Sequence, residues 1–218
     1  MMASPPESIE VAIGPYALKG LLGVPAHAAG LVIFAHGSGS GRLSPRNNRV
    51  AAALREAGLA TLLLDLLTPA EEGNRANVFD IALLATRLSA ATDWALAQAE
   101  TAQLPIGYFG ASTGAGAALT AAAAPRSPVA AVVSRGGRPD LAADALPLVT
   151  APTLLIVGSL DTEVIALNRM AYDRLKAPKE LVIVDGAGHL FEEPGTLDEV
   201  QRHAARWFRR HLAGDRRA

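Results

Sequence analysis

The sequence LPIGYFGASTGAGAALTAAAA, residues 104–124, is the stretch from which the fold can be deduced. A short apolar run leads into Gly110-Ala111-Ser112-Thr113-Gly114, and small residues suited to a helix follow. In a G-x-S-x-G motif between a strand and a helix, the serine sits on a sharp turn that exposes its hydroxyl. The motif alone also fits an ordinary glycine-rich turn in which Ser112 caps a helix. The rest of the chain must decide between these interpretations.

From residue 30 onward, apolar runs of strand length alternate with helical segments. We predict strands at 30–35, 59–64, 105–109, 129–133, 153–157 and 180–184, and helices at 45–57, 80–100, 113–125, 163–175 and 197–212. Residues 8–13 and 17–24 predict a leading antiparallel hairpin, whereas residues 66–79 show no regular pattern. This alternation predicts an α/β fold with a mostly parallel central sheet and helices on both faces.

Length and composition suit a single domain over residues 1–218. Hydrophobic residues make up 50% of the chain and charged residues 19%, so we expect an ordered protein. Twenty Lys and Arg against twenty-one Asp and Glu leave a formal charge of -1, which provides no general attraction to nucleic acid or to anionic membranes. We expect the basic cluster near the end of the chain to be a solvated helix face; it comprises Arg206, Arg209, Arg210, His211, Arg216 and Arg217.

The chain has no cysteine, its first ten residues lack the pattern of a secretory signal, and no apolar run has the length of a membrane span. These features favour a cytoplasmic location. No grouping of His, Asp and Glu has the spacing of metal ligands, and no G-x-x-x-x-G-K phosphate loop occurs. We therefore expect no metal or cofactor, a small-molecule substrate, and a monomer or homodimer.

A serine hydroxyl needs a base to act as a nucleophile, and histidine is the usual one. His189 follows the last predicted strand through a loop of glycine and alanine. Asp161 follows the preceding strand, and Glu163 and Asp185 are the other acids nearby in sequence. Asp161 is better placed at a strand end, whereas Glu163 suits the first turn of the next helix. Functional loops of parallel sheets lie at the carboxyl ends of the strands, so we expect Ser112, Asp161 and His189 at one edge.

The order Ser112, Asp161, His189, together with the serine turn and the loop His36-Gly37-Ser38-Gly39-Ser40-Gly41, resembles the α/β-hydrolases over nearly the whole chain. The short length, the leading hairpin and the lack of a large cap insertion are most similar to the dienelactone hydrolase-like branch. The resemblance implies an α/β-hydrolase fold with little or no cap domain. It also implies Ser112 as nucleophile, His189 as base and Asp161 as acid.

An oxyanion hole follows from the same resemblance, with backbone N–H groups contributed by Thr113 and Ser38. One departure matters: the namesake dienelactone hydrolases use a cysteine nucleophile, and this chain has serine. The serine favours hydrolysis of ordinary carboxylic esters through an acyl-enzyme, and the missing cap favours short or compact acyl groups. Thioesterase, lactonase or dienelactone hydrolase-like activity with the same triad remains an alternative. A non-catalytic binding protein on the same fold is another.

Several further residues at the predicted edge are candidates for substrate binding or for support of the site. His36 and Gly37 are candidate substrate-binding residues, although His36 also suits a structural role in anchoring its loop. Arg135 and Arg138 follow a strand, where each suits either a substrate carboxylate or a salt bridge that fixes the loop. Asp65, at another strand end, suits a structural role.

Overall fold

One sheet of eight strands forms the centre of the computed structural model, which describes residues 8–213. The strands are β1 (Ile9–Ile13), β2 (Leu18–Gly23), β3 (Leu31–Ala35), β4 (Ala60–Leu64), β5 (Ile106–Ala111), β6 (Val129–Arg135), β7 (Thr153–Gly158) and β8 (Lys179–Val184). Their order is β1-β2-β4-β3-β5-β6-β7-β8. The β1–β2 and β2–β4 pairs are antiparallel, and all other pairs are parallel. The predicted α/β fold with a leading hairpin is therefore confirmed.

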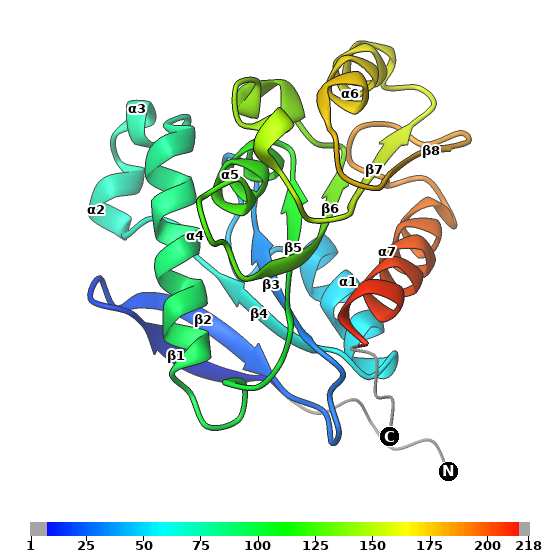
Figure 1. Cartoon of the computed structure of the whole chain (residues 1–218). Coiled ribbons are helices and arrows are strands. Elements are labelled where there is room, and N and C mark those ends of the chain that lie inside the picture. The colour runs from blue at the N-terminus through cyan, green and yellow to red at the C-terminus, as the bar shows by residue number, and fades with distance from the viewer. Residues whose placement is uncertain (1–7, 214–218) are drawn as a thin grey trace.

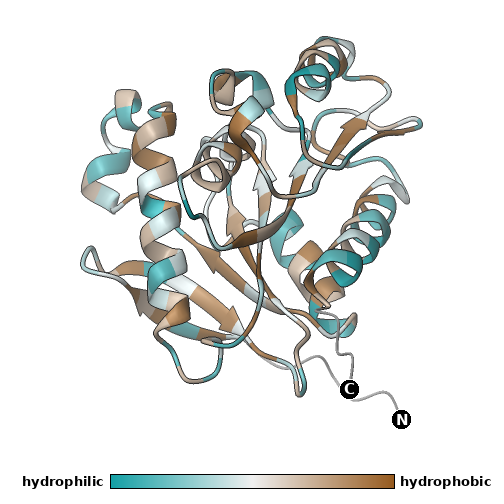
Figure 2. Cartoon of the chain, in the orientation of Figure 1, coloured by the Kyte–Doolittle hydropathy of each residue, from teal (hydrophilic) through white to brown (hydrophobic). Residues whose placement is uncertain are grey.

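Helices cover both faces of this sheet (Figure 1). The helices α1 (Pro45–Glu56) and α7 (Thr196–Leu212) pack on one face, and α4 (Ile81–Leu96), α5 (Thr113–Ala122) and α6 (Thr162–Arg174) pack on the other. Each face has its own hydrophobic core, and Figure 2 shows mostly hydrophobic strands between helices of mixed polarity. The continuous apolar runs of β3 and β4 are explained by this arrangement, because every residue of these two strands is buried.

The boundaries of α1 follow from local chemistry that the sequence displays. Ser44 caps the helix by accepting a hydrogen bond from the backbone N–H of Asn47, and Pro45 occupies the first turn. The helix predicted at 80–100 is too long, because α4 ends at Leu96 rather than at Glu100. The chain then turns back toward β5, and the side chain of Gln98 donates to the Trp94 carbonyl in that turn.

The irregular segment 66–79 contains two short helices that sequence reasoning missed, α2 (Pro69–Glu72) and α3 (Arg75–Val78). A helix of four residues spans about one turn, so it shows no hydrophobic period. A capping signal was nevertheless present, since Thr68 and Glu71 form a capping box at the start of α2. Two 3₁₀ turns after β6, Pro139–Ala142 and Leu146–Leu148, were also not predicted.

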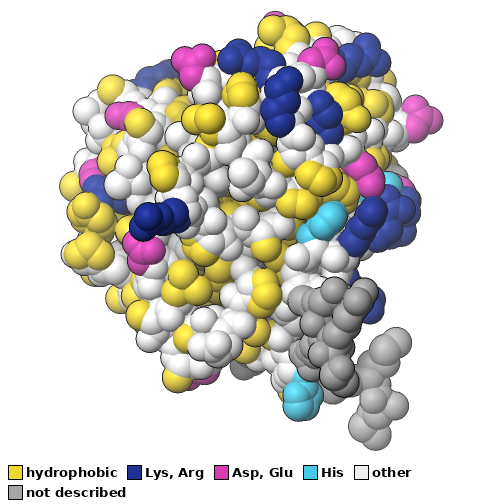
Figure 3. Space-filling view, viewed as in Figure 1, with side chains coloured by type: hydrophobic (Ala, Val, Ile, Leu, Met, Phe, Trp, Pro, Cys, Tyr) yellow, Lys and Arg dark blue, Asp and Glu magenta, His cyan; other side chains and the backbone are white. Residues whose placement is uncertain are grey.

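The surface in the view of Figure 3 carries acidic and basic side chains that are interspersed, with a basic group over α7. On this helix, Arg206 and Arg210 lie 3.6 and 3.7 Å from the Glu180 carboxylate. No helix in residues 8–213 is both long enough and apolar enough to cross a bilayer. Two predictions lie partly outside the described residues. The absence of a secretory signal concerns a segment that includes residues 1–7, and the basic cluster expected on the last helix includes Arg216 and Arg217.

Candidate active site

Ser112 stands between β5 and α5 in a backbone conformation that is unusual for a side-chain-bearing residue. Its φ is +50° and its ψ is −124°. In residues other than glycine, such a conformation costs free energy, and it persists only where the surrounding structure enforces it. The Ser112 carbonyl accepts from the backbone N–H groups of Ala115 and Arg138, each at 3.0 Å, and the Ser112 N–H donates to the Arg135 carbonyl at 3.3 Å. The Ser112 side chain makes no capping bond to α5, so its hydroxyl is not used to start the helix.

Two glycines make the turn at Ser112 possible. A Cβ atom on Gly110 would lie 2.5 Å from the Cα of Ala115, and one on Gly114 would lie 2.1 Å from the Ala35 carbonyl oxygen. Both distances are far below those that real Cβ atoms show. The motif therefore places glycine where the strand, the turn and the helix approach too closely for any side chain.

Asp161 and His189 are joined by a hydrogen bond of 2.6 Å between the Asp161 Oδ2 and the His189 Nδ1. An ionised carboxylate only accepts, so the imidazole Nδ1 carries a proton, and in the neutral ring the Nε2 is then the nitrogen with the free lone pair. The Asp161 side chain is mostly buried, whereas that of His189 is 39% exposed. The two loops also bond through their backbones, because the Leu160 N–H donates to the Ala187 carbonyl at 2.9 Å.

The dipeptide Arg135-Gly136 lies between the serine turn and the histidine loop. The Arg135 carbonyl bonds the Ser112 N–H. On the other side, a Cβ atom on Gly136 would lie 3.0 Å from the His189 carbonyl oxygen and 3.7 Å from the His189 ring carbon Cε1. Gly136 has a φ of +50°, which glycine adopts without strain. The structure therefore bonds Asp161 to His189 directly and places Ser112 on the other side of this dipeptide at the carboxyl edge of the sheet, while no hydrogen bond joins the Ser112 hydroxyl to His189 within residues 8–213.

The glycine-rich loop after β3 lies against the serine turn. A Cβ atom on Gly37 would lie 2.9 Å from the Ser112 Cβ and 3.7 Å from the Ser112 Oγ. The next residue, Ser38, donates its backbone N–H to the Thr113 Oγ1 at 3.0 Å. The residues predicted for the oxyanion hole, Ser38 and Thr113, are thus neighbours beside Ser112, and glycine at position 37 allows this loop to approach the serine closely.

His36, a candidate substrate-binding residue, has both ring nitrogens engaged inside the protein. Its Nδ1 donates to the Gly37 carbonyl at 2.9 Å, and its Nε2 accepts from the Leu66 N–H at 3.0 Å. The same loop is held by Asp65, which accepts the Arg42 N–H at 2.7 Å and pairs with the Arg42 guanidinium at 2.6 Å. In this structure His36 and Asp65 anchor the loop that contains Ser38.

The geometry does not present Arg135, the other candidate for substrate binding, to a ligand. Its side chain is only 6% exposed, and the guanidinium donates to the Asn47 Oδ1 at 3.0 Å. The guanidinium carbon also lies 5.9 Å from the centroid of the Phe191 ring. Burial, together with the charge of Arg46, lowers the pKa of Arg135 to about 10, so the group stays cationic at neutral pH. Arg135 therefore connects α1 to the segment that follows His189.

Arg138 forms the loop-fixing salt bridge that the sequence offered as one alternative. Its Nε and Nη2 atoms donate to the two carboxylate oxygens of Asp140 at 2.9 and 2.8 Å. This bidentate contact raises the pKa of Arg138.

Sequence reasoning missed two residues that support the site, Asn47 and Arg42. Asn47 shares the buried face of α1 with Val50, Ala51 and Leu54. A polar side chain within an apolar stripe was the available signal, because a buried amide needs a partner. Arg42 gave no such signal, since its contact with Asp65 depends on how β3 and β4 pair.

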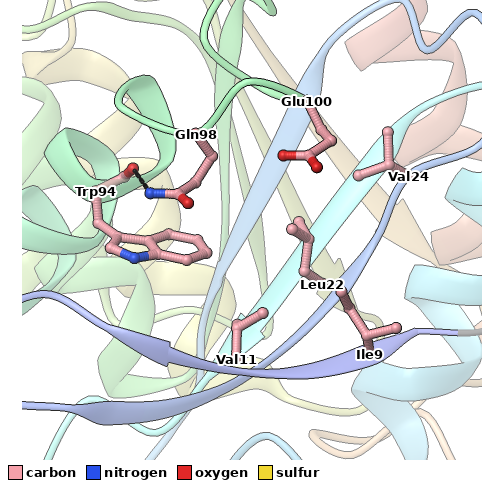
Figure 4. A pocket seen from close by; sticks show the side chains of 7 residues that line it. All are labelled: Ile9, Val11, Leu22, Val24, Trp94, Gln98 and Glu100. Carbon is pink, nitrogen blue, oxygen red and sulfur yellow. Dashed lines mark hydrogen bonds between the residues drawn. The ribbon is translucent and has the colours of Figure 1, made fainter.

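None of the three residues Ser112, Asp161 and His189 lines the cavity of about 340 Å³ that lies near the start of β1 (Figure 4). This cavity is enclosed by Ile9, Val11, Leu22, Val24, Trp94, Gln98 and Glu100. It lies toward the amino ends of the parallel strands, because its residues Gln98 and Glu100 belong to the turn between the end of α4 at Leu96 and the start of β5 at Ile106. Residues 8–213 contain no group of three His, Asp or Glu side chains that could hold a metal ion.

The fold described above is that of an α/β hydrolase, and solved structures share it. A dienelactone hydrolase from Anabaena variabilis has a TM-score of 0.91 and 56% sequence identity, with 96% of this chain and 100% of that chain covered. Est1E from Butyrivibrio proteoclasticus has a TM-score of 0.79 at 18% identity, over 95% and 99% of the two chains, which shows a common fold. This chain belongs to the dienelactone hydrolase family, and the fold supports a hydrolase.

A second relative carries a different name. The Mycobacterium tuberculosis protein called "Putative phosphoribosyl transferase" is 59% identical over 215 residues, which cover 97% of this chain and 48% of that protein. The chain thus spans about half the length of these relatives. No family model matches the chain.

Proposed function

We propose that this protein is a serine hydrolase that cleaves carboxylic esters of short or compact acyl groups. Ser112 is the nucleophile, His189 the base and Asp161 the acid that orients the base. The observation that carries this proposal is the 2.6 Å bond between Asp161 and His189, at the edge where Ser112 adopts its strained turn. With its Nδ1 proton bound by the carboxylate, the imidazole has its other nitrogen available to accept a proton.

In the first half of the reaction, the His189 Nε2 takes the hydroxyl proton of Ser112 as the Oγ attacks the ester carbonyl carbon. The carbonyl oxygen becomes an oxyanion, which is stabilised by the backbone N–H of Thr113 and by a second donor beside it, for which the sequence predicted the Ser38 N–H. Each such donor is worth roughly 3 to 4 kcal/mol in related sites. The imidazolium then gives the proton to the leaving alkoxide, the ester C–O bond breaks, and an acyl group remains on Ser112.

In the second half, His189 takes a proton from water, and the hydroxide oxygen attacks the acyl carbon. The second tetrahedral intermediate collapses as the proton passes from His189 to the Ser112 Oγ. The carboxylic acid leaves, and the serine hydroxyl is restored. The Asp161 carboxylate stabilises the imidazolium in both halves.

The preference for compact substrates rests on the connections around the site. The segment between β6 and β7 contains only two short 3₁₀ turns, and His189 is 39% exposed. Little chain is therefore available to build a deep acyl tunnel over Ser112. We expect turnover of p-nitrophenyl acetate to exceed that of long-chain esters.

The experiment that tests the proposal replaces Ser112. We expect S112A to lose labelling by a fluorophosphonate probe and hydrolysis of p-nitrophenyl acetate, while its thermal unfolding stays close to that of the wild type. The matched control is S38A, which removes a hydroxyl from the site loop but retains the backbone N–H. Full ester hydrolysis by S112A would refute the assignment.

Lactone hydrolysis is the second candidate, because a relative at 56% identity is named a dienelactone hydrolase. The same attack on a cyclic ester opens the ring, and the alcohol stays attached to the acid. A panel of linear esters, thioesters and lactones assayed with wild type and S112A separates these substrates. The substrate class that the wild type hydrolyses and that S112A does not is the class on which the proposed triad acts.

We propose that the transferase name of the longer relatives refers to the part of those proteins that this chain does not match. The hydrolase structure from Anabaena variabilis covers 96% of this chain, so almost no residues remain for a second kind of site. Assaying this protein for both ester hydrolysis and phosphoribosyl transfer tests this division. Transferase activity that survives in S112A would contradict it.

A further inference from the structure

The side chain of Thr113 occupies an unexpected place beside the predicted oxyanion hole. Its Oγ1 accepts the backbone N–H of Ser38 at 3.0 Å, across 75 residues of sequence. The Thr113 residue is only 6% exposed and opens α5 directly after Ser112. One of the two amides expected to bind an oxyanion therefore already has a partner, and that partner belongs to the residue that supplies the other amide.

The direction of this bond leaves the hydroxyl hydrogen of Thr113 free to act as a donor. An amide N–H only donates, so the Thr113 oxygen accepts, and its own hydrogen can bond elsewhere. Threonines inside helices usually donate to the carbonyl four residues earlier, as Thr86 does to Ala82 at 2.9 Å and Thr92 does to Leu88 at 3.0 Å. Thr113 is the first residue of its helix, so α5 offers it no such carbonyl.

The residue that carries this hydroxyl is also the first residue of α5, directly after Ser112. Gly37, which precedes Ser38, lies close to the Ser112 side chain, because a Cβ atom on Gly37 would lie 2.9 Å from the Ser112 Cβ. On the other side, the first backbone N–H groups of α5 receive no bond from the Ser112 side chain. The Thr113 hydroxyl is thus placed between the Ser38 amide and the start of α5, next to the nucleophile.

We propose that the Thr113 hydroxyl, together with the Thr113 amide, is a donor of the oxyanion hole in the place expected for the Ser38 amide, and that the bond it accepts from Ser38 polarises it. This inference rests on the proposed serine hydrolase function. The chain of bonds runs from the Ser38 N–H to the Thr113 Oγ1, and from the Thr113 O–H to the oxyanion. Consecutive hydrogen bonds strengthen one another, so the Ser38 amide makes this hydroxyl a better donor. Its contribution belongs to the transition state, where the carbonyl oxygen carries charge.

The test compares T113V with T113S, because valine matches the shape of threonine without the hydroxyl, and serine restores the hydroxyl. Loss of one oxyanion donor lowers kcat by about 10² to 10³-fold in related sites. We expect T113V to lower kcat for p-nitrophenyl acetate by about 10²-fold with little change in KM, since the contact acts on the transition state. T113S should stay within about tenfold of wild type. The matched control is T86V, where the same change removes a hydroxyl far from the site on α4.

A second readout distinguishes a donor from a residue that only holds the loop. A trifluoromethyl ketone adds to the serine and forms an oxyanion, so its affinity reports on the hole directly. T113V should weaken this inhibitor by about as much as it lowers kcat. If Thr113 only held the Ser38 loop, KM would rise as well, and the inhibitor and kcat would not change in parallel. If T113V does not fold, as judged by thermal unfolding, the T113S and T113A pair gives the same comparison.

The outcomes also separate this inference from the proposed function. A wild-type protein that hydrolyses no ester and is not labelled at Ser112 overturns both. Active wild type, inactive S112A and T113V with wild-type kcat overturn the role of the Thr113 hydroxyl alone. A faster T113V would also overturn it, since that result would show the hydroxyl competing with the oxyanion for the Ser38 amide.

Discussion

Replacing Gly114 with alanine tests whether the close approach of the serine turn to the β3 loop is required. A Cβ atom at this position would lie 2.1 Å from the Ala35 carbonyl oxygen and 2.5 Å from that of His36. Since real Cβ atoms essentially never come within 3.0 Å, the helix and the loop must separate by at least about 0.9 Å. Both opposing atoms belong to the backbone, so no side chain can rotate away.

The cost of this separation follows from two opposing effects. Overpacking costs about 1 to 3 kcal/mol, while alanine improves the helix by about 0.5 to 1 kcal/mol over glycine. We expect G114A to lose about 2 kcal/mol of unfolding free energy, since rigid backbone places the clash at the upper end, and Tm to fall by about 4 to 8 °C. A displacement near 1 Å also separates Ser38 from Thr113, so kcat should fall by about 10²-fold.

The assay combines thermal unfolding with p-nitrophenyl acetate kinetics. The matched control is G73A, because a Cβ on Gly73 would meet its nearest atom, the Ala70 carbonyl oxygen, at an ordinary 3.5 Å. Gly73 also has a φ of −60°, which alanine adopts readily. We expect G73A to keep both the Tm and the kcat of the wild type. A G114A protein with the stability and activity of the wild type would refute the packing argument.

Two further predictions concern the acid and the pH dependence of stability. D161N should lower kcat by about 10⁴-fold, because an amide no longer fixes the useful tautomer of His189. The control D185N should leave kcat unchanged. Equal losses of kcat in the two variants would contradict the choice of Asp161 as the acid. Burial, then nearby arginines, lower the pKa of His203 and His211 below 6.5. The unfolded chain then binds more protons below about pH 6.5, so unfolding free energy should fall on acidification through that range. Urea titrations at about pH 7.5 and 5.5 should show a smaller fall in the H203Q/H211Q double variant, and an equal fall would argue against this linkage.

Local features of the sequence determined most of the secondary structure. Ser44 and Pro45 mark the start of α1 because capping depends on residues within one turn. The buried strands β3 and β4 show as apolar runs because every side chain of each strand faces a core. The helices α2 and α3 escaped notice because one turn is too short for a period.

The sequence also indicated which segments lie at one edge of the sheet. Parallel strands share a direction, so the segments after β5, β7 and β8 must lie at one edge once the sheet is recognised. Ser112, Asp161 and His189 could therefore be chosen from sequence position, and Gly110 and Gly114 marked the sharp turn. This inference needed the direction of the strands but no knowledge of side-chain contacts.

Only the tertiary structure decided how the supporting side chains pair. Whether Arg135 faces a substrate or Asn47 depends on where the fold places α1 relative to the end of β6, and Asn47 is 88 residues away in sequence. The Ser38–Thr113 bond likewise needs β3 and β5 to be neighbours, which the strand order fixes. Capping and periodicity are properties of adjacent residues, so a sequence displays them. Contacts between distant segments depend on strand order and side-chain direction, and these exist only in the folded chain.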